Sequence, residues 1–478
     1  MQSPAAQNRS SRSALDAPPL DLVAARERVR SCSPSLSRDL GATALIEASG
    51  DMALSALAAS AHVALDLEGA RAAARRADEH VARGEDPGAL AGLSVSIKDL
   101  FDVRGDITRA GSTWLNEGRP ATADAVAVAR LRAAGGALIG RTQMTEFAFS
   151  GVGLNPHTGT PANATLSQLG RPGRVPGGST SGGAVSVGCG ASWAALGSDT
   201  GGSLRIPAAL HGLVGYKCSQ HLVPRTGSVP LAPSFDTIGA ITRSVRDAIV
   251  LHEILAGRRV ALAGRPLASL RLGWTRRHFL DALDTETGVA WQRCLDTLAA
   301  AGATLVECPV DALDELPRLT DGGGITAAEA WAWHEPHLAD HADDYDPRVL
   351  SRIQRGQAIG TGRLAGLHTL RADWIGRMNA QIAAVDVMLA PTVARTPPPI
   401  AAVQDDTDAF FDLNAALLRN PAVINLLDGC AISLPSPVAA GSAPVGLMVW
   451  ASRDADDTLL DAALAIEATL RDTGAREP

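Results

Sequence analysis

Two glycine- and serine-rich stretches, PGGSTSGG at residues 176–183 and GSDTGGSLRIPA at residues 197–208, dominate the middle of this 478-residue chain. They lie in a longer tract, residues 151–202, that is unusually rich in Gly, Ser and Thr and begins without the apolar pattern of a helix. Glycines on both sides of a serine let backbone N–H groups face a ligand without a Cβ in the way. A tract of this length inside a compact domain is usually functional, so we expect it to form a binding or catalytic site.

Strand and helix patterns alternate on both sides of this tract. Helical patterns cover residues 21–84, 122–134 and a segment near 286–301. Strand patterns cover residues 93–97, 137–139, 270–274, 304–306 and 385–389. We find no internal repeat. Alternation of this kind predicts an α/β fold in which a sheet carries helices on both faces.

The composition excludes several classes of protein. The net charge is −8, and 41 arginines are spread along the chain, which argues against a nucleic-acid coat. No apolar stretch is long enough to span a membrane, and residues 1–20 lack the apolar centre of a secretory signal, so we expect them to be a disordered N-terminus. The six cysteines are scattered without a CxxC pair, which favours a reduced cytoplasm and no zinc site.

The chain has only two lysines, Lys98 and Lys217. A lysine can lose its proton in a suitable environment and an arginine does not, so each lysine is a candidate base. Lys98 ends the strand at residues 93–97, which would bury its stem. Lys217 follows a strand-like segment, residues 213–216, and we expect a structural or surface role for it.

Three common chemistries fail to account for the tract. A phosphate loop needs GxxxxGK[ST], and neither lysine follows a glycine in that pattern. A dinucleotide fingerprint needs GxGxxG between a strand and a helix, and this is absent. A nucleophile elbow needs GxSxG, but Thr180 stands at the centre of Gly178–Gly182. The combination of serine and lysine remains.

The tract closely resembles the signature of the amidase signature family. Ser96-Ile-Lys98-Asp99 precedes it and Gly212-Leu-Val-Gly-Tyr-Lys217 follows it, as in that family. Further segments resemble the family in the family's order: residues 142–147, 386–392, 425–429 and 444–447. The resemblance covers roughly residues 45 to 470. It implies a single large α/β domain, residues 21–475, whose central twisted mixed β-sheet is covered by helices on both faces.

The resemblance also implies roles for individual residues. The family's Ser–cisSer–Lys triad falls on Ser203 as the acylated nucleophile, Ser179 as the proton relay and Lys98 as the general base. The peptide bond before Ser179 would be cis. The oxyanion hole would be formed by the backbone N–H groups of Thr200, Gly201, Gly202 and Ser203.

The residue types suit this assignment. A serine hydroxyl is a weak nucleophile that needs a base within hydrogen-bond reach. A lysine with its ordinary pKa of about 10.4 is protonated at neutral pH, but burial in a dry site lowers that pKa. A hydroxyl both donates and accepts, so Ser179 can relay a proton. Ser203 begins a predicted short helix, residues 204–210, whose N–H groups would favour a developing oxyanion.

Other residues near the tract have open roles. Phe149, Ser150 and Gly151 occupy the segment that approaches the acyl pocket in the family, together with Phe147, and are candidates for substrate contact. Ser181 is either a further hydrogen-bond partner of the lysine, close to the substrate, or a plain turn residue. Asp199 and Arg205 would orient the glycine loop.

A second cluster lies outside the tract. His334, His337 and His341 stand beside two tryptophans at near-helical spacing. They could bind zinc, form a wall or lid of the pocket, or pack within a helix. We expect Pro336 to interrupt the helix between them, which weakens the zinc interpretation.

We therefore expect a stand-alone serine hydrolase that cleaves a C–N acyl bond of a small amide, aryl amide, urea or carbamate through an acyl-enzyme on Ser203. The alternative is a glutaminase component of a tRNA-dependent amidotransferase, which would need partner subunits. A catalytically silent scaffold is disfavoured by the intact Lys98, Ser179 and Ser203. We expect no cofactor, no metal, no nucleic acid and no membrane partner, a monomer or homodimer, and a location in the bacterial cytoplasm.

Overall fold

The computed structural model describes residues 21–32 and 40–474, with side chains to residue 471. The N-terminal segment that we expected to be disordered, residues 1–20, lies outside the described residues. Within them, eleven strands form one mixed sheet in the order β1-β3-β2-β4-β6-β5-β10-β11-β9-β7-β8. The strands are β1 (His62–Leu65), β2 (Ser94–Lys98), β3 (Ala137–Thr142), β4 (Ala194–Asp199), β5 (Val214–Lys217), β6 (Thr237–Thr242), β7 (Arg271–Trp274), β8 (Thr304–Glu307), β9 (Val387–Pro391), β10 (Cys430–Pro435) and β11 (Gly446–Ala451).

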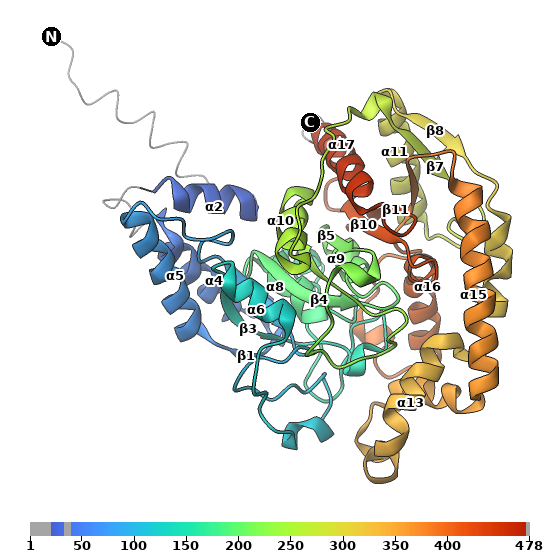
Figure 1. Cartoon of the computed structure of the whole chain (residues 1–478), viewed down its shortest axis with the longest axis horizontal. Coiled ribbons are helices and arrows are strands. Elements are labelled where there is room, and N and C mark those ends of the chain that lie inside the picture. The colour runs from blue at the N-terminus through green and yellow to red at the C-terminus, as the bar shows by residue number, and fades with distance from the viewer. Residues whose placement is uncertain (1–20, 33–39, 475–478) are drawn as a thin grey trace.

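Helices pack on both faces of this sheet. The α-helices are α2 (Leu22–Arg30), α4 (Ala42–Ala53), α5 (Leu67–Ala82), α6 (Val126–Ala133), α7 (Ala164–Gln168), α8 (Ser181–Cys189), α9 (Arg205–His211), α10 (Val245–Ala256), α11 (Thr285–Ala300), α12 (Leu316–Thr320), α13 (Gly324–His341), α14 (Pro347–Gln354), α15 (Thr361–Ile382), α16 (Thr407–Leu426) and α17 (Asp456–Gly474). Figure 1 shows the two ends of the sheet on opposite sides of the molecule, with β1 near α4 and α5 and with β7 and β8 near α11. Helices α8 and α9 contact each other and the strands β4 and β5, while α10 and α17 contact each other and the strands β6 and β10. In the described part of the chain, no helix has the length and apolar character to cross a bilayer.

The centre of the sheet places the two ends of the serine tract together. Strand β2 lies between β3 and β4 and is parallel to both. Ile97 pairs with Leu196, so Lys98 at the end of β2 lies beside the last residues of β4. Parallel strands end at the same edge of a sheet, and this edge therefore collects Lys98, Ser198 and Asp199.

The glycine-rich tract contains more regular structure than its composition suggests. It includes the short helix α7, the helix α8 and the strand β4. Helix α8 is buried along nearly its whole length, and its glycines let it approach the sheet closely. An added Cβ on Gly182 would stand 2.2 Å from the backbone oxygen of Ala61.

The predicted α/β architecture is confirmed, and two local predictions are wrong. The helical pattern over residues 21–84 is broken by strand β1, which is only four residues long and pairs as an edge strand with β3. Its alanine-rich surroundings conceal so short a strand. Pro336 does not interrupt its helix, because α13 continues from Gly324 to His341 through it.

The close packing of α8 gives a stability prediction. Replacing Gly182 with Ala forces a Cβ against backbone, and overpacking of this kind costs about 1–3 kcal/mol. Gly376 is a matched control, since it lies within helix α15 with nothing near its missing Cβ. Gly376→Ala should raise the free energy of unfolding by up to about 1 kcal/mol. Urea unfolding of both variants checks this; equal stability of the two would contradict the packing of α8 described here.

Candidate active site

Lys98 is fully buried at the end of β2, and its amine contacts two serine hydroxyls. Nζ donates to Ser179 Oγ at 2.8 Å and to Ser198 Oγ at 2.9 Å. Burial lowers the pKa of Lys98 to about 7, although the carboxylates of Asp199 and Asp236 oppose this shift. A substantial fraction of the amine is therefore neutral at physiological pH.

Ser179 and Ser203 are brought together by backbone contacts. The peptide bond between Gly178 and Ser179 is cis, as the family resemblance implies. The N–H of Thr180 donates to the carbonyl of Ser203 at 3.3 Å, which joins the segment that carries Ser179 to the start of α9. Both serine side chains are nearly inaccessible, at 0% and 3% exposure. Lys98, Ser179 and Ser203 thus lie in one buried cluster.

A buried ion pair braces the loop before Ser203. The carboxylate of Asp199 accepts from Arg205 Nε at 3.0 Å and Nη2 at 2.8 Å, and Asn425 bonds both residues. Burial alone would raise the pKa of Asp199, but the charge of Arg205 and the hydrogen bonds from Arg205 and Asn425 together outweigh burial and lower it to about 2. The expected orienting role of Asp199 and Arg205 fits these contacts.

The same brace engages one of the four expected oxyanion donors. The N–H of Gly202 donates to Asp199 Oδ1 at 2.9 Å. Thr200, Gly201 and Ser203 line the adjacent pocket and Gly202 does not. The N–H of Gly202 is thus already engaged within the loop, while Thr200, Gly201 and Ser203 lie on the cavity side.

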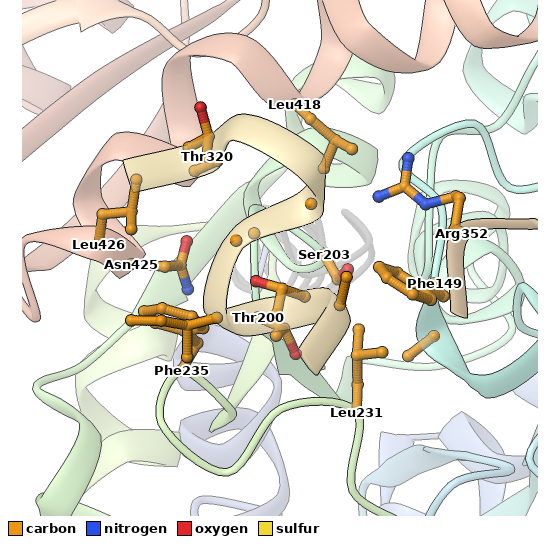
Figure 2. A pocket seen from close by; sticks show the side chains of 18 of the residues that line it. Phe149, Thr200, Ser203, Leu231, Phe235, Thr320, Arg352, Leu418, Asn425 and Leu426 are labelled. Atoms are coloured by element: carbon orange, nitrogen blue, oxygen red, sulfur yellow. The ribbon is translucent and has the colours of Figure 1, made fainter. Parts of the chain in front are cut away.

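A cavity of about 160 Å³ opens beside Ser203 (Figure 2). Its walls come from six parts of the chain: residues 148–150, the loop that carries Thr200, Gly201 and Ser203, the loop that carries Leu231 and Phe235, residues 319–327 at the start of α13, Arg352 and Arg355 around the end of α14, and helix α16. Most of the lining is apolar. None of the described residues that line it is acidic.

Arg352 is, with Arg355, one of the two charged side chains in this lining. Its Cζ lies 4.5 Å from the centre of the Phe149 ring, and Figure 2 shows the guanidinium directed into the cavity. The Nε atom is buried without a hydrogen-bond partner, and among the described residues no carboxylate forms an ion pair with Arg352. Burial lowers the pKa of Arg352 to about 10, helped by the charge of Arg355, so the group stays positive at neutral pH.

The predicted substrate-contact residues divide into two groups. Phe149 and Ser150 line the cavity. Gly151 does not; its N–H donates to Asn414 Oδ1 at 2.9 Å. Ser181 begins helix α8, and its hydroxyl bonds the carbonyl of Gln143 at 3.4 Å, so the second hydroxyl on Lys98 belongs to Ser198 instead.

Phe147 and the histidine cluster serve packing. Phe147 lies edge-on to His334 at 4.5 Å between ring centres, and His334 Nδ1 bonds the Tyr345 hydroxyl. His337 and His341 pack on Trp114. The described residues contain no group of His, Cys, Asp or Glu side chains arranged to hold a metal ion. Of the three interpretations of these histidines, helix packing is the one that fits.

Lys217 is buried as well, which excludes a surface role. Its Nζ donates to the carbonyls of Cys218 and Gly429 and so joins β5 to the turn before β10. Arg352 and Ser198 are the site residues that we did not single out from the sequence. Ser198 lies inside the signature and could have been found there, whereas Arg352 carries no local signal that separates it from the other arginines.

Comparisons with known proteins identify the family. The family model for Amidase matches residues 45–460. A 2-amino-5-chloromuconic acid deaminase from Comamonas testosteroni is 35% identical over 410 residues, which span 84% of this chain and 86% of the relative. A glutamyl-tRNA(Gln) amidotransferase subunit from Koribacter versatilis is 30% identical over 86% of this chain and 91% of its own. A crystal structure of an amidase matches with a TM-score of 0.81 at 32% identity, covering 94% of this chain and 100% of the amidase.

The chain therefore belongs to the amidase family, and the expected fold and family are confirmed. It is an amidohydrolase that acts on carbon–nitrogen bonds.

We expect a large loss of stability when the negative charge of the buried Asp199–Arg205 ion pair is removed. Asp199→Asn keeps the shape of the side chain but leaves the fully buried Arg205 without a counter-charge, so we expect the free energy of unfolding to fall by about 3–5 kcal/mol. Asp412→Asn, which breaks the exposed pair with Arg395, is the control and should cost no more than about 1 kcal/mol. Chemical unfolding measures both; similar small losses would show that the brace is not structural.

Proposed function

We propose that this protein hydrolyses a carbon–nitrogen acyl bond through an acyl-enzyme on Ser203, with Ser179 as proton relay and Lys98 as general base. One observation carries the proposal: the buried amine of Lys98, whose pKa lies near 7, contacts Ser179 Oγ at 2.8 Å. Ser179 in turn lies next to the segment that carries Ser203. A base with a pKa near the working pH is the most effective general catalyst.

The proposed reaction proceeds in two halves. Ser203 Oγ attacks the carbonyl carbon while its proton passes through Ser179 to Lys98, and the carbonyl oxygen becomes an oxyanion. The carbon–nitrogen bond then breaks, and the proton from Lys98 returns through Ser179 to the leaving nitrogen. Water attacks the acyl-Ser203 ester in the second half, aided by the same base. The products are a carboxylic acid and an amine or ammonia, and the serine is regenerated.

The oxyanion is proposed to bind the N–H groups of Thr200, Gly201 and Ser203. These residues line the cavity, whereas the N–H of Gly202 already bonds Asp199. Donors held in place before the reaction stabilise the transition state without the cost of reorganising solvent. The Asp199–Arg205 pair supplies this rigidity, since it fixes the loop from both ends.

The cavity favours a substrate with an acid group. The Arg352 guanidinium is directed into it, next to Arg355, and lacks a carboxylate partner among the described residues. A substrate carboxylate could accept two parallel hydrogen bonds from such a group. The apolar walls suit a short carbon chain between this carboxylate and the amide. The name of the Comamonas testosteroni relative, 2-amino-5-chloromuconic acid deaminase, likewise gives an acid as the substrate.

The same charges argue against the glutaminase alternative. Similarity to amidotransferase subunits keeps that function in consideration. Glutamine, however, carries an ammonium group as well as a carboxylate. The cavity lining offers Arg352 and Arg355 to the carboxylate and no acidic side chain to the ammonium, so burying that cation would be unfavourable.

The nucleophile is tested by Ser203→Ala. We expect amide hydrolysis to fall by more than about 1,000-fold, because the covalent step is lost. Release of ammonia is measured over a panel of short dicarboxylic acid monoamides, neutral amides and glutamine, with mass spectrometry of the acylated peptide. Ser167→Ala, a serine outside the cavity, is the control. Substantial turnover by the Ser203→Ala variant would refute the assignment of Ser203 as the nucleophile.

The acid preference is tested by Arg352→Gln. The variant should lose about 100-fold in kcat/KM for the monoamide of a short dicarboxylic acid, since it loses a charge-assisted pair. The matched amide with a methyl group in place of the carboxylate serves as the internal control and should change by no more than about threefold. Equal losses on both substrates would point to a structural role for Arg352, and a wild-type preference for glutamine would favour the alternative function.

A further inference from the structure

The amine of Lys98 has a second partner that the proposed reaction leaves without a role. Ser198 Oγ lies 2.9 Å from Nζ, almost the same distance as Ser179 Oγ. Both hydroxyls are buried, with exposures of 4% and 0%. The described hydrogen bonds of the Ser198 side chain consist of this one contact.

The sheet holds Ser198 in place on both sides. It is the last but one residue of β4, and it pairs with Ile238 of the antiparallel strand β6. On the other side β4 runs parallel to β2, the strand that ends in Lys98. Successive side chains of a strand point to opposite faces, so Ser198 turns to Lys98 while Asp199 turns to Arg205. The position of the hydroxyl is therefore set by backbone pairing.

A neutral lysine amine has two N–H donors and one lone pair, and the lone pair must face the group that gives up a proton. If the amine rotates freely, the lone pair faces Ser179 only part of the time. An acceptor that engages one N–H limits this rotation.

We propose that Ser198 is a positioning residue for the catalytic base: its Oγ accepts one N–H of Lys98 and thereby directs the amine lone pair at Ser179. The inference rests on the proposed role of Lys98. After proton transfer the ammonium donates to both hydroxyls, so Ser198 also stabilises the charged form that arises during the reaction. Ser198 itself exchanges no proton with the substrate.

Other charges near Lys98 bear on its titration. Asp199 on β4 and Asp236 in the loop before β6 both favour the ammonium. Asp99, the residue after β2, is paired with Arg141 of β3 at 2.6 Å. Helix α8, which packs on β2 and β4, carries no charged side chain. A change at Ser198 leaves all these groups in place, so a shift in the Lys98 titration reports on the hydroxyl.

Because the chain contains only two lysines, the titration of Lys98 can be followed directly. Protein labelled with ¹³C at lysine Cε contains two signals, and Lys98→Met identifies that of Lys98. In the full-length protein, Ser198→Ala removes an acceptor from the ammonium, which disfavours the charged form. We expect the titration midpoint of Lys98 to fall by about one pH unit and the high-pH plateau of kcat/KM to fall about 10-fold on the monoamide that the wild type turns over fastest.

Matched variants separate positioning from general damage. Ser198→Thr keeps the hydroxyl and should stay within about threefold of the wild-type plateau, while Ser198→Cys keeps the shape with a poor acceptor and should behave like Ser198→Ala. Ser96→Ala removes a buried hydroxyl from β2 that bonds Ser192 instead, and should move neither readout. The cysteine variant decides the question if the alanine variant does not fold.

The inference is overturned if Ser198→Ala leaves the titration midpoint of Lys98 unmoved and the high-pH plateau of kcat/KM within about twofold of wild type. A raised plateau in this variant would also overturn it, because it would mean that the Ser198 hydroxyl competes for the lone pair. The two proposals fail in different ways. An active Ser203→Ala refutes the proposed function and with it the role of Lys98 as base. An inactive Ser203→Ala with an unimpaired Ser198→Ala refutes only the role of Ser198.

Discussion

The buried ion pair between Asp199 and Arg205 is the contact on which the site depends. Neither side chain is exposed, and in so dry a place each charge requires the other. Asp199 ends β4 and also accepts from the backbone of Gly202 and Leu204, so one carboxylate fixes the glycine loop, the start of α9 and Ser203 together. The glycines allow the loop to bend, and the ion pair decides which bend it adopts.

The same edge of the sheet provides the dry environment of Lys98. Parallel pairing of β2 with β4 brings the amine to the serines, and burial moves its pKa into the range where it can exchange protons. The lysine that could serve as a base and the loop that could hold an oxyanion are thus positioned by two neighbouring strands. Arg352 approaches the cavity from another part of the fold, and it keeps its charge because an arginine does so even when buried.

Sequence reasoning recognised the segments of a family signature even where they lie far apart in the chain, as Lys98 and Ser179 do. Lys98 and Lys217 both belong to the signature, yet only Lys98 reaches the serines; the amine of Lys217 bonds two carbonyls instead. Reasoning failed where long-range packing decides the outcome. Pro336 is accommodated inside α13, and the short strand β1 was concealed by its alanine-rich flanks.

The sequence by itself determined the family and the α/β fold, and its resemblance to the family supplied the three residues proposed for catalysis, because the signature segments keep their residue types and order along the chain. Only the tertiary structure decided the cavity and its charge. Its walls come from segments hundreds of positions apart, which meet through sheet pairing and helix packing. Arg352 becomes a candidate for substrate binding because the fold directs its side chain into a cavity that holds no counter-charge. No local sequence pattern predicts that placement.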